Sequence, residues 1–272
     1  MTAIRLAPSW LAALTVALML FLYAPLVIAV LYAFNGGSNL TWPPQGFSLQ
    51  WFAEIFGDSE FRAALTVSFE AAIASSVLST AIGTTAAFVF ARRRSRVSRL
   101  VEGLARLPVM LPPLFIGVGL VALMAVLNFA PSLLTIIIGH TIVTVPFVVI
   151  VVMARLRTYE TELELAARDL GADPWQAIRR ITLPIIAPAV VGAALLAFAF
   201  SFDEVLVTNF TSGALSTVPI YVLGRLRRYT DPGANAVATI LLLIPWISFG
   251  AGAIFLRRTG GSIGELLGQR VK

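Results

Sequence analysis

The sequence predicts an all-α integral membrane protein, a helical bundle with six transmembrane helices, and three observations support this fold class. Hydrophobic residues make up 58% of the 272 residues, and the mean hydropathy is +0.88. Charged residues make up only 12%, about half of their share in an ordinary soluble domain. Six apolar stretches each come close to the ~20 residues that a helix needs to cross the hydrocarbon core of a bilayer.

The six expected spans follow one another without an internal repeat, so we expect a single transmembrane domain over residues 1–272. The first span carries no charge. It is also longer than the apolar core of a signal peptide, roughly 7–15 residues, which favours a retained helix. The spans cover about residues 10–34, 63–91, 109–130, 133–154, 185–210 and 234–256.

The distribution of positive charge predicts the orientation of the chain. All but four of the 20 Lys and Arg residues fall on one side of the expected membrane, six of them between the second and third spans. Because cytoplasmic loops are enriched in Lys and Arg, we expect both termini and the loop between the fourth and fifth spans in the cytoplasm. The same rule explains the net charge of +6 without any nucleic acid. The four exceptions are Arg62, Arg225, Arg227 and Arg228.

The loop between the fourth and fifth spans, residues 158–184, is expected to form two short helices separated by a glycine. Thr161 and Glu164 have the spacing of a capping box, which would begin the first helix. Gly171 can adopt the left-handed conformation that ends this helix. Asp173, followed by Pro174, would begin the second helix.

Three environments compete for this amphipathic segment: solvent, the lipid headgroups, or a partner protein. Lipid is disfavoured because anionic headgroups repel carboxylates. The amphipathic spacing alone does not separate a docking helix from a solvated loop, since such helices are common. The glycine turn and the exit Ile181-x-Leu183-Pro184 favour a partner protein. The acidic residues of the segment are Glu160, Glu162, Glu164, Asp169 and Asp173.

The residue inventory excludes several kinds of site. No cysteine is present, and a single histidine, His140, rules out a two-histidine metal site, so we expect no metal and no cofactor. The only lysine is Lys272, which excludes a P-loop for ATP. His140 lies in the fourth span, where it could relay protons, but a hydrogen-bonded packing histidine is favoured.

The loop resembles the signature loop of ABC-importer permease subunits in the spacing of Ala166-Ala167, Gly171, Ile181 and Leu183-Pro184. One position departs from that motif: Leu165 stands where the family has glutamate, and Glu164 lies one residue earlier. On a helix this offset turns the carboxylate by about 100°. Glu164 could reach the same partner from another angle, or Leu165 could replace a charged contact by an apolar one.

Three further segments, Gly46–Phe52, Leu107–Pro112 and Ser201–Val205, resemble the spermidine/putrescine permeases of the C-subunit type. The resemblance implies a type I ABC importer permease fold in a bacterial inner (plasma) membrane, with the chain forming half of a pathway for polyamines. It also implies a second permease subunit in a heterodimer, an ABC ATPase dimer that binds the ATP, and a periplasmic or extracellular solute-binding protein. The implied ATPase-coupling residues are Glu164, Leu165, Ala166, Ala167, Gly171, Ala172, Ile181, Leu183 and Pro184.

Acidic residues within the spans are candidates for the substrate pathway, since a carboxylate there is costly and functional by default. Both Glu70 and Asp203 are expected about 10 Å below the outer surface, and ammonium groups are attracted to carboxylates and aromatic faces. A structural alternative pairs Asp203 or Glu204 with the arginines of residues 225–228. The pathway candidates are Asp203, Glu204, Glu70 and Phe202.

Other functions stay open on sequence alone. The cargo of an ABC importer could instead be ferric iron, a phosphonate, an opine or another amino-acid derivative. An ion-coupled secondary transporter would show internal repeats, and the cytoplasmic loop would have no role in it. A membrane enzyme would need a catalytic constellation, for which one histidine and no cysteine leave little material.

Overall fold

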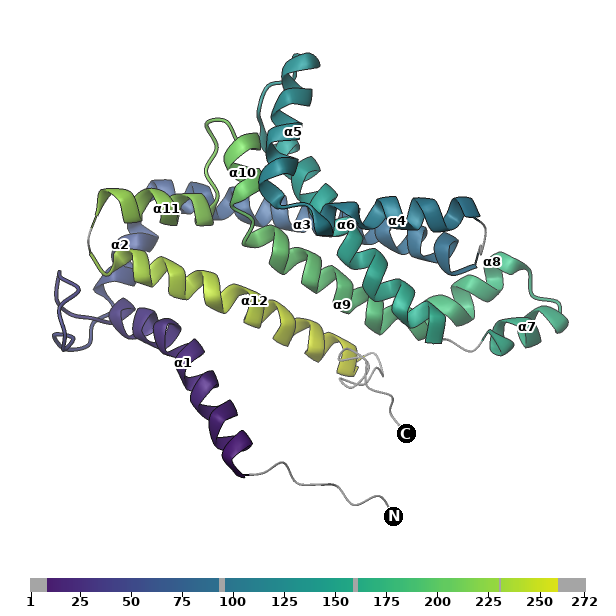
Figure 1. Ribbon diagram of the computed structural model, residues 1–272, viewed down its shortest axis with the longest axis horizontal. Helices are drawn as coiled ribbons and strands as arrows, with labels where there is room; N and C mark the ends of the chain where they lie inside the picture. The colour runs from purple at the N-terminus through teal and green to yellow at the C-terminus, as the bar shows by residue number, and fades with distance from the viewer. Residues whose placement is uncertain (1–8, 93–95, 159–160, 230, 259–272) are drawn as a thin grey trace. The chain divides into compact units, whose positions relative to one another are not determined.

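The computed structural model describes residues 9–92, 96–158, 161–229 and 231–258 (Figure 1). Arg93 and Arg94 of the expected arginine-rich loop, Glu160, and the expected cytoplasmic tail beyond Arg258 lie outside these residues. Within the described ranges the chain is helical, and its one β-type pairing is an isolated bridge. The expected all-α class is confirmed.

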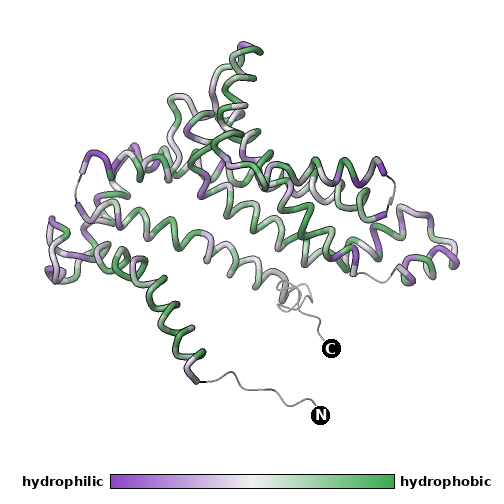
Figure 2. The backbone as a smooth tube through the Cα atoms, in the orientation of Figure 1, coloured by the Kyte–Doolittle hydropathy of each residue, from purple (hydrophilic) through white to green (hydrophobic). Residues whose placement is uncertain are grey.

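Five helices of the described chain are long and apolar enough to cross a membrane, and they occupy five of the six expected spans. They are α1 (Ser9–Ala33), α3 (Ser59–Arg92), α6 (Leu133–Thr158), α9 (Leu183–Phe202) and α12 (Gly233–Arg258). Figure 2 shows these helices as mainly hydrophobic, with polar residues gathered toward the connecting segments. The chain therefore has the pattern of a multi-pass membrane protein.

The third expected span, residues 109–130, is wrong in its bounds. Its helix, α5 (Pro113–Val126), has 14 residues and is about 21 Å long, short of the ~30 Å hydrocarbon core. An amphipathic helix, α4 (Arg96–Met110), precedes it. The two helices are separate because a residue before a proline, here Leu111 before Pro112, disfavours the helical conformation. The structure therefore does not bear out six helices of full length.

The chain forms two compact units, residues 1–62 with 222–242 and residues 63–221 with 243–272. In the first unit, a short helix that the sequence analysis missed, α2 (Gln50–Gly57), lies between the first and second expected spans. Its Trp51 is buried and donates a hydrogen bond from Nε1 to the carbonyl of Asn35, at 2.8 Å. This bond and the packing of Trp51 against Ala33 and Ala236 tie the loop to α1 and α12.

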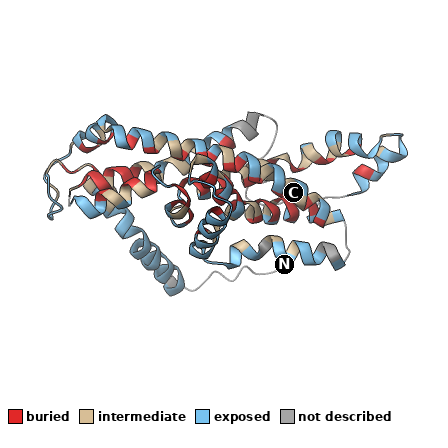
Figure 3. Cartoon of the chain, turned by 90° about the horizontal axis from the view of Figure 1, so that it is seen from above, coloured by how far each residue is buried: buried red, intermediate tan, exposed pale blue. Residues whose placement is uncertain are grey.

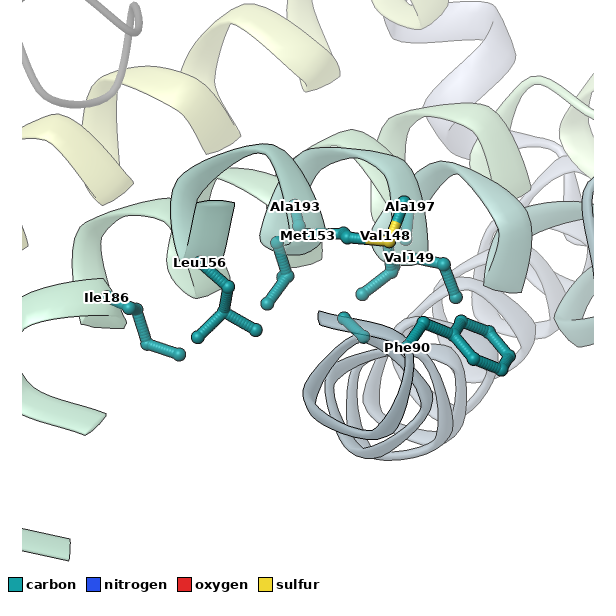
Figure 4. Close-up of a cluster of buried hydrophobic side chains, with 10 residues drawn as sticks. Phe90, Val148, Val149, Met153, Leu156, Ile186, Ala193 and Ala197 are labelled. Atoms are coloured by element: carbon teal, nitrogen blue, oxygen red, sulfur yellow. The ribbon is translucent and has the colours of Figure 1, made fainter. Parts of the chain in front are cut away.

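The core of the second unit lies among α3, α6 and α9 (Figure 4). Gly83 of α3 allows a close approach, because a Cβ atom there would lie 2.7 Å from the Cβ of Val148 on α6. Small residues at such positions let two helices pack closely inside a membrane. The main buried side chains of this core are Phe90, Val148, Val149, Val152, Met153, Leu156 and Ile186.

α1 is mostly exposed in the single chain, and Figure 3 shows this helix pale blue along most of its length. None of its most apolar 18-residue window is buried. The interior of a bilayer is as apolar as these side chains, so the exposure carries no hydrophobic penalty in a membrane.

Gly83→Ala is expected to lower the thermal stability of the purified protein in detergent. Its new methyl group would meet the rigid branch point of Val148 at 2.7 Å, and overpacking of this kind costs about 1–3 kcal/mol. Gly250→Ala on α12 is the matched control, since nothing lies within 4 Å of a Cβ at that position. Equal melting temperatures for the two variants would contradict the close α3–α6 contact.

Candidate functional site

The first expected loop helix forms as α7 (Glu162–Asp169), but the expected capping box does not. Thr161 makes no side-chain capping bond. The carboxylate of Glu164 turns away from it and accepts hydrogen bonds from Arg92 on α3, at 2.6 Å, and from the hydroxyl of Thr182, at 2.9 Å. The Arg92 guanidinium carries a full positive charge, so it attracts the carboxylate more strongly than an uncharged backbone N–H does.

The glycine turn forms as expected. Gly171 has a φ of +93°, and two bonds close a Schellman motif over the end of α7. The N–H of Ala172 donates to the carbonyl of Ala167 at 3.0 Å, and that of Gly171 to the carbonyl of Arg168 at 2.9 Å.

The second loop helix, α8 (Pro174–Ala177), also begins as expected. The Asp173 side chain accepts from the N–H groups of Trp175 and Gln176, at 2.8 and 2.9 Å. α8 is not a separate element, however. A π-helical turn, Ile178–Thr182, joins it to α9 without a break. Pro174–Phe202 is therefore one continuous helix of 29 residues, which begins in the loop and forms the fifth span.

The loop exposes large apolar side chains. Leu170 is 90% exposed, Trp175 64% and Leu165 54%. Leu165, at the position where the family motif has glutamate, therefore offers an apolar contact at the surface. Among the other predicted coupling residues, Ala166, Gly171 and Pro184 are exposed, whereas Ala167, Ala172, Ile181 and Leu183 are partly buried.

The fifth span ends earlier than expected, because α9 stops at Phe202 instead of reaching residue 210. Asp203, Glu204 and Val205 separate it from the short helix α10 (Leu206–Thr211). This break distinguishes the two adjacent carboxylates. Glu204 accepts from the N–H of Val207 at 2.9 Å and caps α10. Asp203 is exposed, and its carboxylate has no hydrogen-bond or ion-pair partner within the described chain.

The arginine expected to pair with Asp203 or Glu204 has other partners. Arg225, on α11 (Val218–Arg228), pairs with Glu54 at 2.8 Å and with Asp231 at 3.2 Å. Its guanidinium also lies over the ring of Tyr229. Arg225 is thus paired with acids of the first unit and not with Asp203 or Glu204.

Glu70 and Asp203 lie at a similar level of the second unit. The preceding residues, Phe69 and Phe202, are in edge-on ring contact with centroids 5.2 Å apart. Glu70 is exposed and lines an open, mostly apolar hollow of about 700 Å³ between α3 and α6. Phe202 is only 2% exposed, so in this conformation its ring packs in the core and presents no face to a cation.

His140 is a packing histidine at the centre of a buried hydrogen-bond chain. Its Nδ1 lies 2.7 Å from Ser201 Oγ, and its Nε2 lies 2.7 Å from Thr208 Oγ1. Ser75 Oγ extends the chain to Ser201 at 2.8 Å, and the Thr208 hydroxyl donates to the carbonyl of Glu204 at 2.7 Å. The chain links α3, α9, α6 and α10 and ends at the break beside Asp203.

The hydrogen-bond chain also sets the tautomer of the histidine. Because the Thr208 hydroxyl gives its proton to the Glu204 carbonyl, its oxygen accepts from Nε2–H of His140. Nδ1 then accepts from Ser201. Sequence reasoning missed Ser75, Ser201 and Thr208 as partners of His140, because no local pattern brings these four helices together.

Comparison with protein families settles the family. Residues 79–261 match the family described as the inner membrane component of binding-protein-dependent transport systems. The chain belongs to this family. The matched region contains the loop with α7 and α8, the break after α9, and the His140, Ser201 and Thr208 members of the hydrogen-bond chain.

Two relatives within the family are bacterial permeases. The putrescine transport system permease protein PotI of Escherichia coli is 34% identical over 231 residues, covering 82% of each chain. The spermidine/putrescine transport system permease protein PotC of the same species is 29% identical over 249 residues, covering 90% of this chain and 94% of PotC.

Solved structures of ABC importers share the fold. A chain of the alginate ABC transporter in complex with an alginate-bound periplasmic protein is 16% identical and covers 93% of this chain and 94% of its own, with a TM-score of 0.69. A chain of the inward-facing MetNI methionine transporter is 18% identical and covers 72% and 94%, with a TM-score of 0.65. The expected type I ABC importer permease fold is confirmed.

His140→Leu is expected to destabilise this permease by about 1–3 kcal/mol, because it leaves the buried Ser201 and Thr208 hydroxyls without their shared partner. Thermal unfolding in detergent measures the loss. Thr141→Val is the matched control, since the Thr141 hydroxyl bonds only to the carbonyl of Ile137 in its own helix. If the two variants melt at the same temperature, the hydrogen bonds of His140 do not stabilise the helix bundle.

Proposed function

We propose that the chain is one permease subunit of an ATP-driven importer for polyamines such as putrescine and spermidine. The observation that carries this proposal is its likeness to two polyamine permeases, PotI and PotC, over more than four fifths of its length. The proposal places the protein in a bacterial inner membrane with both termini in the cytoplasm. It forms half of the translocation pathway.

The proposed assembly has a second permease subunit, a dimer of ABC ATPases and a solute-binding protein. ATP is bound and hydrolysed by the ATPase, because the only lysine of this chain, Lys272, cannot form a P-loop. The chain itself is not an enzyme and uses no cofactor. The uncovered α1 gives the second permease a surface to pack against, and the exposed leucines of the loop give the ATPase one.

The pathway side of the proposal depends on Asp203 and Glu70. A carboxylate without a partner is costly inside a membrane protein and calls for a cation. A polyamine carries several separated ammonium groups, and two acids at a similar level of the bundle can replace part of their lost hydration. Glu204 is given no part in this proposal, because its carboxylate already accepts from the N–H of Val207 and caps α10.

The importer proposal makes the ATPase the partner of the loop, so Leu170→Asp is expected to abolish co-purification of the ATPase with the permease. Leu170 is 90% exposed, and a carboxylate there would lose its hydration in an apolar interface. Leu215→Asp, an exposed leucine in the segment before α11, is the control and should retain the ATPase. Normal ATPase recovery with Leu170→Asp would contradict docking at this residue.

Asp203→Asn is expected to reduce putrescine uptake by at least tenfold in proteoliposomes that contain the complete transporter, while the subunits still assemble. Glu204→Gln should leave uptake within about twofold, because its amide oxygen can still accept from Val207 and cap α10. If both variants lost the same share of putrescine uptake, transport would depend on the structure of the break and not on the charge of Asp203. Uptake of a different solute in place of putrescine would redirect the cargo proposal.

A further inference from the structure

We propose that Arg92, Glu164 and Thr182, here called the Glu164 clasp, form a joint that carries movement of α7 into α3 and α9. The clasp positions the loop; it does not bind the ATPase. This inference rests on the proposed function, because it assumes that the loop receives force from an ATPase.

Three elements meet at one carboxylate oxygen. Oε2 of Glu164 on α7 lies 2.6 Å from Arg92 Nη2, at the cytoplasmic end of α3, and 2.9 Å from Thr182 Oγ1, at the entry to α9. Thr182 is fully buried, and the Glu164 side chain is 12% exposed. A displacement of α7 must therefore either stretch both hydrogen bonds or move Arg92 and Thr182 along with Glu164.

The orientation of α7 assigns docking and force transmission to different residues of the helix. Glu164 points into its own chain, whereas its neighbours Leu163 and Leu165 are 51% and 54% exposed. The carboxylate that stands one residue before the position of the family glutamate is thus turned inward. A partner can contact the leucines, and the clasp then connects that contact to the body of the permease.

The clasp also lies at the π-helical turn of the continuous helix that leaves the loop. Thr182 is the last residue of the π-helical turn between α8 and α9. A π turn widens the helix and interrupts its regular hydrogen bonding, and such turns are frequent at functional sites. The bond from Thr182 to Glu164 braces this turn against α7, so that the loop and α9 move together.

The ion pair is held from both sides. The Arg92 guanidinium lies over the ring of Phe88, 5.4 Å from its centroid, which limits its freedom to leave Glu164. Removal of Arg92 would leave a largely buried carboxylate without its countercharge, a costlier change than the loss of an exposed pair. A second ion pair outside the loop provides a matched comparison: Arg157 and Glu102 lie 3.2 Å apart, and the Glu102 side chain is 13% exposed, much as Glu164 is.

The test uses the complete transporter in proteoliposomes and compares the single variants Glu164→Arg and Arg92→Glu with the double variant that exchanges the two charges. Each single variant should still co-purify with the ATPase and hydrolyse ATP, but import at least tenfold less putrescine per ATP. The double variant should recover at least half of the wild-type ratio. Arg157→Glu should leave the ratio unchanged.

Two outcomes would overturn the inference. Loss of ATPase co-purification in Glu164→Arg would make Glu164 a docking residue. An unchanged ratio of putrescine to ATP in the single variants Glu164→Arg and Arg92→Glu would show that the clasp transmits no movement.

A second readout keeps the inference independent of cargo and of folding defects. The chain has no cysteine, so a cysteine introduced at Leu206 on α10 is its only thiol, and ATP should change its reaction rate with a membrane-impermeant reagent. Thr182→Val should weaken this ATP response and Thr182→Ser should retain it. Equal responses in these two variants would overturn the role of Thr182. Absence of putrescine uptake by the wild type would count against the proposed cargo alone.

Discussion

The structure depends on the rule that polar groups in a membrane must find partners inside the protein. Lipid offers no hydrogen bonds, so each buried hydroxyl or imidazole either is paired or destabilises the fold. The chain from Ser75 through Ser201, His140 and Thr208 meets this rule with contacts of 2.7–2.8 Å on four helices. Because a hydroxyl has one proton to donate, fixing the direction of one bond fixes the others. The bundle therefore has one favoured register around His140.

The same rule explains why the break after α9 is tolerated. Irregular backbone at membrane depth persists only where its groups are satisfied within protein or face a water-filled space. Here the carbonyl of Glu204 accepts from Thr208, and the carboxylate of Glu204 covers the N–H of Val207. These two bonds satisfy polar backbone groups at the break and so stabilise its non-helical conformation. Asp203, which contributes to neither, is left exposed at that point.

Local rules recovered the parts of the site that depend on neighbouring residues. The left-handed Gly171 and the Asp173 cap follow from spacings of a few residues, and both formed as predicted. Predictions that depend on distant segments did less well. Thr161 and Glu164 fit a capping box, but Arg92, 72 residues away, takes the carboxylate. The end of α9 was also missed, because apolar composition continues through the break and nothing local marks Phe202 as the last helical residue.

The inward turn of Glu164 changes how the loop sequence is interpreted. A motif comparison alone treats Leu165 as the loss of a charged contact, with Glu164 as its displaced substitute. In the structure the two residues have different surroundings, one at the surface and one 12% exposed beside Arg92 and Thr182. On α7 a shift of one residue is a rotation of about 100°, which is enough to exchange the outside of the helix for the inside. A partner that docks on this loop therefore meets leucine, and the charge of Glu164 is used to hold the loop to its own permease.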